Sequence, residues 1–206
     1  MSIKQRNLCK CFALAQKEGL VAPIEVVFGV IVFVFALIGL ARGFLRELGV
    51  TTIMMFLLFF LSRFEPVLDK GMVRLMSTGG RFLPTQDKDL LQCWFFVLVV
   101  IGGAFISYQG ETLAFGGQSP RGTQGISLGL LVGLLNGYLI AGTIWFYMHK
   151  FNYPIAFLGF SGDRLSNLAR ELIPFLPIQF LGQPVLLGQS LLLYLSGLLL
   201  IARVIR

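Results

Sequence analysis

Apolar residues gather in long, almost uninterrupted runs along this chain of 206 residues. Crossing about 30 Å of hydrocarbon takes about 20 helical residues, with a working range of about 17–25. Four runs approach or meet this length, at residues 21–41, 48–62, 90–108 and 126–148. The pattern therefore predicts an all-α fold, a polytopic bundle of transmembrane helices.

A fifth apolar run, at 184–202, opens with a proline at a helix-start position. It contains Gln189, Ser190 and Ser196, so it either spans the membrane or lies at the interface. Its length favours spanning, which gives four to five spans in all. The predicted organisation is then a basic leader at 1–20, a membrane domain at 21–175 and a C-terminal segment at 176–206.

Two connecting segments, 63–75 and 163–173, place apolar residues at three- and four-residue spacing with charges between them. This spacing predicts two amphipathic helices lying along the membrane surface, the second capped by Ser161 or Asp163. Cytosolic helices packed on the bundle would have the same pattern.

Composition supports lipid as the solvent for much of the chain, because 56% of residues are hydrophobic and only 13% are charged. The net charge of +7 does not change this picture. Basic residues are commonly retained beside the cytoplasmic leaflet, and here they are scattered between spans with no RNA-binding signature. We therefore expect the lipid bilayer, and no nucleic acid, as a partner.

Basic residues also predict the orientation. With the N-terminus inside, five spans place twelve lysines and arginines in the cytoplasm and five outside. The short hairpin carrying Arg42 and Arg46 opposes this orientation. The first 20 residues hold no apolar core long enough for a signal peptide, so the first span is expected to serve as the insertion signal.

Small residues form a stripe on the fourth run, where Gly125, Gly129, Gly133 and Gly137 recur every four residues. Such a ridge lets another helix approach backbone to backbone. Asn136 falls near the same face, where its amide can hydrogen-bond across to a neighbouring helix. The stripe predicts packing within one chain, with a homo-oligomer contact or a pore lining as alternatives.

The first run has a matching face that carries Glu25, Gly29, Gly39 and Gly43. An ionisable residue inside a span is costly, so Glu25 is either an ion or proton site or lies at headgroup depth. We favour headgroup depth unless Glu25 pairs with a basic residue such as Arg121.

A basic turn follows the first run. Arg42 and Arg46 are one helical turn apart, so both are expected to reach lipid phosphates on the same side, and Glu47 can pair locally.

This turn carries the segment Arg42-Gly43-Phe44-x-Arg46-Glu47, and Glu25 precedes its first arginine by seventeen positions. The combination resembles the CvpA family of colicin V production proteins. The glycine run of the fourth span and the Leu-Pro segment 168–174 are similar to later motifs of that family. Two positions depart from its pattern: Asn136 stands where arginine is common, and Glu25 where aspartate is usual. The resemblance implies a bacterial inner-membrane protein linked to toxin production, export or envelope maintenance, with no established catalytic activity.

An enzyme is not expected. Gly159-Phe160-Ser161-Gly162 matches a serine-protease motif of rhomboid type, but that chemistry needs a histidine base in a facing span. The only histidine, His149, ends the fourth run, and a haem or pigment ligand is its less favoured alternative role. Three cysteines, Cys9, Cys11 and Cys93, suit neither a disulfide framework nor a metal site. We therefore predict no catalytic residue, no metal and no cofactor.

Two non-catalytic functions remain open at the level of sequence. One is a self-sufficient CvpA-like protein, alone or as a homo-oligomer. The other is a small accessory or scaffold subunit of a larger respiratory, photosynthetic or transport complex, packed through its glycine faces.

Overall fold

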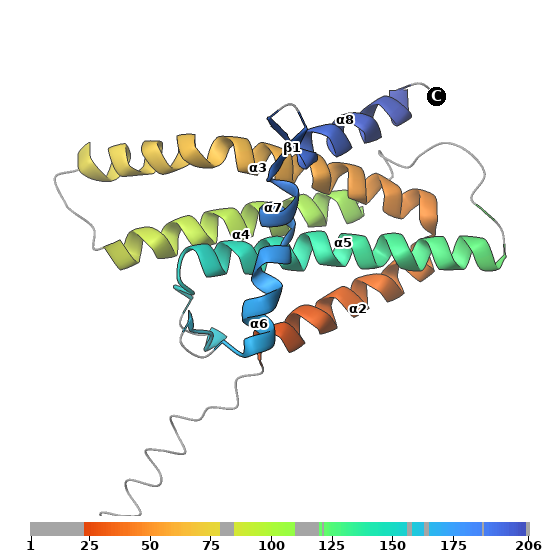
Figure 1. Cartoon of the computed structure of the whole chain (residues 1–206), viewed down its shortest axis with the longest axis horizontal. Coiled ribbons are helices and arrows are strands. Elements are labelled where there is room, and N and C mark those ends of the chain that lie inside the picture. The colour runs from red at the N-terminus through yellow and green to blue at the C-terminus, as the bar shows by residue number, and fades with distance from the viewer. Residues whose placement is uncertain are drawn as a thin grey trace, which may run out of the picture.

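Four long helices, aligned roughly along one axis, form the body of the molecule in the computed structural model (Figure 1). They are α2 (Ile24–Arg42), α3 (Phe44–Thr78), α4 (Thr85–Gln109) and α5 (Thr123–Lys150). The structure describes residues 23–78, 85–109, 120, 122–155, 158–162, 165–186 and 188–204. The basic leader, Cys9, Cys11, Asp163 and Arg121 lie outside the described residues.

All four helices are long and apolar enough to cross a membrane, as far as the described residues go. Each predicted span coincides with one of them, although the first was expected to begin at 21 and α2 begins at Ile24, so the prediction of an all-α, multi-pass membrane bundle is confirmed. Large apolar side chains cover the outside, including Val30, Phe105 and Ile106, the last of which is 70% exposed. On a protein in water these patches would be unfavourable, whereas here they face lipid.

The amphipathic helix expected at 63–75 is not a separate surface helix. Instead, α3 is one unbroken helix of 35 residues, and Pro66 lies inside it. Two acidic side chains of this stretch are paired within the bundle, because Lys150 of α5 pairs with Glu65 and lies 4.0 Å from Asp69. Gln92 of α4 donates a further hydrogen bond of 3.1 Å to Asp69. Those polar partners let α3 follow its neighbours instead of turning along the membrane surface.

After α5 the chain crosses the bundle in short pieces, α6 (Asn167–Leu172), the 3-10 turn η3 (Ile173–Phe175) and α7 (Pro177–Leu181). Helix α6 starts at Asn167, later than the expected 163–173 helix. Its cap is Ser166, whose hydroxyl accepts from the Ala169 N–H at 3.0 Å. Pro174 lies in the first turn of η3 and Pro177 is the first residue of α7. Because proline disrupts the interior of an α-helix, the two prolines keep this segment from forming one longer helix.

The C-terminal segment differs most from expectation. In place of a helix from Pro184, a hairpin of β1 (Pro184–Leu186) and β2 (Gln189–Ser190) precedes α8 (Leu191–Val204). Gly188 takes the left-handed conformation, with φ of 74°, that this turn requires. The 14 residues of α8 rise about 21 Å, less than the hydrocarbon thickness. The expected continuous fifth span at 184–202 is therefore not formed.

Candidate functional site

Helices α2 and α5 meet backbone to backbone along a seam of glycines. A Cβ added at Gly39 would lie 2.3 Å from the carbonyl oxygen of Gly129. One at Gly133 would lie 2.5 Å from the oxygen of Phe35, and one at Gly137 would lie 2.8 Å from the Cα of Val32. No side chain fits at these three places. The glycine ridge is thus occupied by a helix of the same chain.

Two glycines expected on this seam lie elsewhere. Gly29 is exposed, and a Cβ there would meet nothing within 4 Å. It follows Phe28, which packs on Trp145 of α5, and successive residues of a helix point about 100° apart, so Gly29 faces away. A Cβ added at Gly125 would lie 2.1 Å from the carbonyl oxygen of Pro120, just before the start of its own helix, and would meet no second helix.

Gly43 is the hinge between α2 and α3. Its φ of 86° and ψ of 159° are strained for any residue with a side chain, although a Cβ would have open space around it. Because the helix breaks here, Arg42 and Arg46 do not share a side as predicted. Arg42 turns toward the bundle, while Arg46 is exposed. Phe44 begins α3, and its N–H lies beside Gly129 at the end of the seam.

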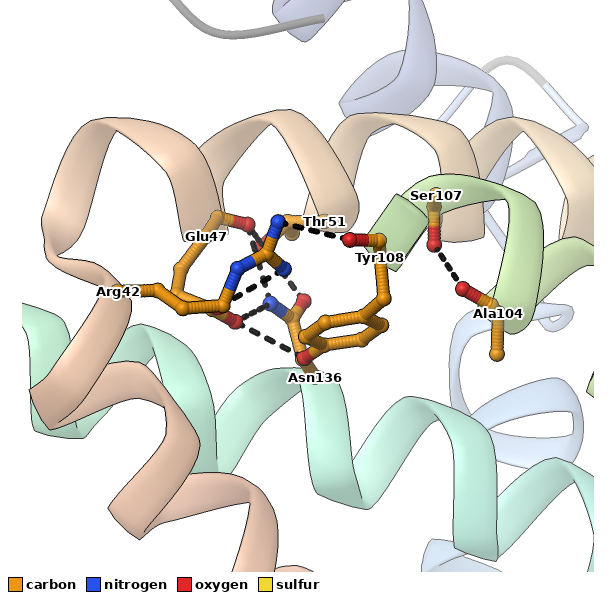
Figure 2. A network of polar contacts seen from close by, with 7 residues as sticks. All are labelled: Arg42, Glu47, Thr51, Ala104, Ser107, Tyr108 and Asn136. Carbon is orange, nitrogen blue, oxygen red and sulfur yellow. Dashed lines mark hydrogen bonds and ion pairs between the residues drawn. The ribbon is translucent and has the colours of Figure 1, made fainter. Parts of the chain in front are cut away.

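The hinge brings Glu47 into a polar cluster between the spans, which we call the Glu47 site (Figure 2). The Glu47 side chain has no exposed surface. Its Oε2 accepts hydrogen bonds from the Tyr108 hydroxyl at 2.9 Å and from Asn136 Nδ2 at 2.8 Å. Its Oε1 faces Arg42 Nη1 at 3.4 Å. A buried carboxylate is tolerable only with such partners, and here they come from α2, α4 and α5.

Asn136 has all of its polar atoms engaged with α3. Its Nδ2 donates to the Glu47 backbone oxygen at 3.0 Å as well as to the carboxylate. Its Oδ1 accepts from the Thr51 hydroxyl at 2.7 Å. These contacts fix which way the amide points, since only the nitrogen can donate and only the oxygen can accept. The amide thereby joins α5 to α3.

Arg42 joins the hinge to the end of α4. Its Nη2 donates to the Tyr108 backbone oxygen at 3.1 Å. Its guanidinium also lies 4.6 Å from the centre of the Tyr108 ring. Carbonyls in the last turn of a helix lack helical partners, so a cation is favourable there. With its side chain 23% exposed, Arg42 closes the outer rim of the site and balances the charge of Glu47.

Sequence reasoning marked three members of this site, Arg42, Glu47 and Asn136, but did not place them together. It missed Thr51 and Tyr108. Thr51 follows Glu47 by one helical turn, a spacing that could have marked it. Tyr108 ends the third run, and nothing in the sequence signals that it reaches Glu47.

Glu25 lies away from this site, near the start of α2. Its Oε1 accepts from the Ser166 hydroxyl at 2.6 Å, and the same Ser166 caps α6. This partner is a neutral hydroxyl, and the glutamate ties the start of the first span to the crossing segment.

His149 is half-buried at the last turn of α5, with its ring centre 5.8 Å from that of Tyr153. Tyr153 in turn accepts a 3.1 Å hydrogen bond from the indole of Trp145. Burial raises the pKa of the Tyr153 phenol. This aromatic group closes the end of the bundle opposite the Glu47 site.

Comparison with known proteins finds no relative of this chain. No family model, curated protein or solved structure matches it.

Proposed function

We propose that this chain is a CvpA-like protein of the bacterial inner membrane, which acts through helix packing in toxin production, toxin export or envelope maintenance. One observation carries the proposal. Arg42 and Glu47 of the first motif meet Asn136 of the glycine-rich motif, 89 positions after Glu47, in one buried site. Motifs selected only by chance resemblance have no reason to converge in space.

Four residues of the first motif have a task in this arrangement, while Arg46 is exposed. Gly43 supplies the hinge, Arg42 and Glu47 supply the buried pair, and Phe44 starts α3 against the seam. The site holds its charges in balance and its hydrogen bonds within the protein. Such a site stabilises one arrangement of helices, which supports a non-catalytic role.

The departure at Asn136 also fits this role. An arginine here would bring a second positive charge to Glu47, whereas the amide donates two hydrogen bonds without adding charge. Arg42 alone then balances Glu47 in the Glu47 site. We propose that the departure keeps the packing function of this position and removes any function of its charge.

The charge distribution supports a cytoplasmic N-terminus, since twelve basic residues before residue 184 then lie inside, and three, Arg42, Arg46 and Arg121, lie outside. Helices α2 and α5 run antiparallel, so the Lys150 end of α5 faces the same side as the start of α2. Single cysteines at Lys70 and at Thr123, labelled from outside intact cells, test this orientation. We expect labelling at Thr123→Cys and none at Lys70→Cys, and the reverse pattern contradicts it.

The function is tested by complementation. A bacterium that makes colicin V, lacking its own CvpA-family protein, should recover toxin release or resistance to detergent when it expresses this chain. Glu47→Ala should not restore the phenotype, while the matched variant Glu171→Ala, at an exposed glutamate, should. Failure of the unaltered chain, when it is inserted and folded, contradicts the proposal.

The alternative of an accessory subunit depended on glycine faces free to bind another protein. Gly39, Gly129, Gly133 and Gly137 are all in contact within the chain. The glycine ridge therefore does not support that alternative.

A further inference from the structure

The crossing segment of α6, η3 and α7 begins at the end of the bundle where α5 stops. The Ser166 hydroxyl donates to Glu25 at 2.6 Å, so α6 starts beside the first turn of α2. Arg170 and Glu171 are exposed on α6, as charged groups at headgroup depth would be. Residues 172–202 carry no charge. The chain therefore enters the hydrocarbon after α6.

A contact with α5 places the next residues near the middle of the membrane. The Tyr138 hydroxyl donates to the carbonyl oxygen of Phe175. Tyr138 lies twelve residues before Lys150, and nine after Gly129, which is beside Phe44 at the hinge. α5 thus rises about 18 Å on one side of Tyr138 and about 14 Å on the other, together close to the hydrocarbon thickness of about 30 Å. The segment has reached middle depth at Phe175.

Near this depth the chain unwinds before it becomes helical again. Figure 1 shows the β1–β2 hairpin beside the middle of α3. Val185 of β1 is 57% exposed, and Gln183 and Gln189 are exposed in the same turn of chain, so nothing in the described part of the chain covers this side of the hairpin. Non-helical backbone at membrane depth is tolerated only where protein buries it or water reaches it. Lipid alone would leave these polar groups without partners.

The exposed side chains differ on the two sides of the hairpin. The approach from α6 exposes polar side chains, at Asn167, Arg170, Glu171, Gln179 and Gln183. Phe175 and Phe180 are exposed there too, so the approach presents both kinds of group, as a segment between lipid and water does. Beyond the hairpin, α8 exposes large apolar side chains instead, at Leu198, Leu200 and Ile201. Polar partners for water therefore lie on the approach and not on α8.

We propose that water enters from the Lys150 end of the bundle, follows the polar groups of the crossing segment and reaches the β1–β2 hairpin at middle depth. The hairpin is then the floor of a hydrated recess that opens to one side of the membrane only. Water supplies hydrogen-bond partners to the uncovered backbone and to the glutamine amides. Beyond Glu171 the recess carries amides and no charge, which suits water and small neutral hydrogen-bonding solutes more than ions.

Helix α8 closes the recess from the other side. It runs from the hairpin toward the end where α2 joins α3 (Figure 1). Its 14 residues rise about 21 Å, more than the about 15 Å that is half the hydrocarbon thickness. The crossing segment and α8 together then form one discontinuous crossing, and the end of α8 lies on the opposite side from α6.

This inference rests on the membrane placement of the proposed function, and its test needs no toxin phenotype. Val185→Cys is introduced into the full chain with Cys9 and Cys11 changed to serine, while Cys93 stays because it is fully buried. A membrane-impermeant thiol reagent is applied to intact cells and to inverted membrane vesicles. We expect Val185→Cys to be labelled from the side that labels Lys70→Cys and to be protected from the other.

The matched control is Val34→Cys, a valine in the middle of α2 that is 46% exposed and faces lipid. It should be protected from both sides. Ala202→Cys, near the end of α8, should be labelled from the side that labels Thr123→Cys. Because sidedness is read against Lys70→Cys and Thr123→Cys, an inverted orientation would contradict the proposed orientation and leave this inference standing.

Three outcomes overturn the proposal. Protection of Val185→Cys from both sides means that protein or lipid covers the hairpin, and a disulfide formed from it on oxidation identifies the protein. Labelling of Val185→Cys from the Thr123 side means that water enters along α8. Labelling of Ala202→Cys from the Lys70 side, or from neither side, means that α8 does not complete the crossing.

A second variant dries the approach without moving the reporter. Gln179→Leu and Gln183→Leu, both at exposed positions, are added to the Val185→Cys chain. Labelling of the cysteine should become several-fold slower while the helix content stays unchanged. The same pair of changes at Leu198 and Ile201, each to alanine, should leave the labelling rate unaltered. An unchanged rate in the Gln179→Leu, Gln183→Leu chain also overturns the proposal.

Discussion

The α2–α5 seam and the Glu47 site hold the same bundle by opposite means. At the seam, contact depends on side chains being absent, since a Cβ at Gly133 would lie 2.9 Å from the Cα of Gly39. At the Glu47 site, contact depends on side chains being present and matched, with Glu47 and Asn136 linked at 2.8 Å. The seam therefore fails when volume is added, and the Glu47 site fails when a partner is removed.

Adding volume to the seam should have the largest effect. Gly133→Leu places a side chain against the backbone of α2, where nothing flexible can move aside. Overpacking costs about 1–3 kcal/mol where repacking is possible and more where backbone blocks it. We expect loss of the folded bundle, measured as aggregation in mild detergent.

The matched control is Gly102→Leu, since a Cβ at Gly102 meets nothing within 4 Å. This variant should purify as the unaltered chain does. Equal behaviour of Gly133→Leu and Gly102→Leu would show that the seam does not hold the bundle.

Removing a partner from the Glu47 site should cost less than filling the seam. Asn136→Leu leaves Glu47 Oε2 with Tyr108 alone, and the Thr51 hydroxyl keeps only the Glu47 backbone oxygen of its own helix, at 3.1 Å. A buried group left unsatisfied costs about 1–3 kcal/mol. We expect the free energy of unfolding of this variant, measured by SDS titration, to fall by that amount. Leu135→Ala, on the exposed face, is the control and should change it little. An unchanged Asn136→Leu variant would contradict the role of the amide.

The length of the apolar runs was sufficient to predict the four spans, and the spacing of small residues predicted the α5 side of the seam, because both depend on features local to one helix. The 3.6-residue repeat placed Gly129, Gly133 and Gly137 on one face without knowledge of the partner. The Glu47 site needed more, since Tyr108 enters it only through the docking of α4. The C-terminal hairpin was missed because an apolar run of 19 residues outweighed the turn at Gly188.

A smaller change separates hydrogen bonds between helices from those within one. Thr51→Val removes the hydroxyl that reaches Asn136, while Thr52→Val removes one that bonds Leu48 in its own helix. We expect Thr51→Val to cost about 1 kcal/mol, because bonds between transmembrane helices contribute about that much, and Thr52→Val to cost less. Equal costs in SDS titration would mean that Thr51 does not couple α3 to α5.

The smallest effect is expected outside both regions. Ser166→Ala removes the hydrogen bond to Glu25 and the cap of α6 together. Loss of a helix cap costs about 0.5–2 kcal/mol, but α6 has only six residues and the four spans do not depend on it. We expect faster hydrogen exchange in α6 and an unchanged unfolding of the bundle. Unfolding of the whole bundle at lower SDS would instead place Glu25 and Ser166 among the contacts that hold it.

The central claim is that Arg42 and Glu47 of the first motif form a charge-balanced pair inside the bundle, and a double-mutant cycle on these two residues tests it most directly. Arg42→Gln alone leaves a buried carboxylate without its cation, at a cost of about 2–3 kcal/mol given that Arg42 is partly exposed. Adding Glu47→Gln removes that charge, so the double variant should regain part of the loss, with a coupling of more than about 1 kcal/mol. Strictly additive losses would contradict the account.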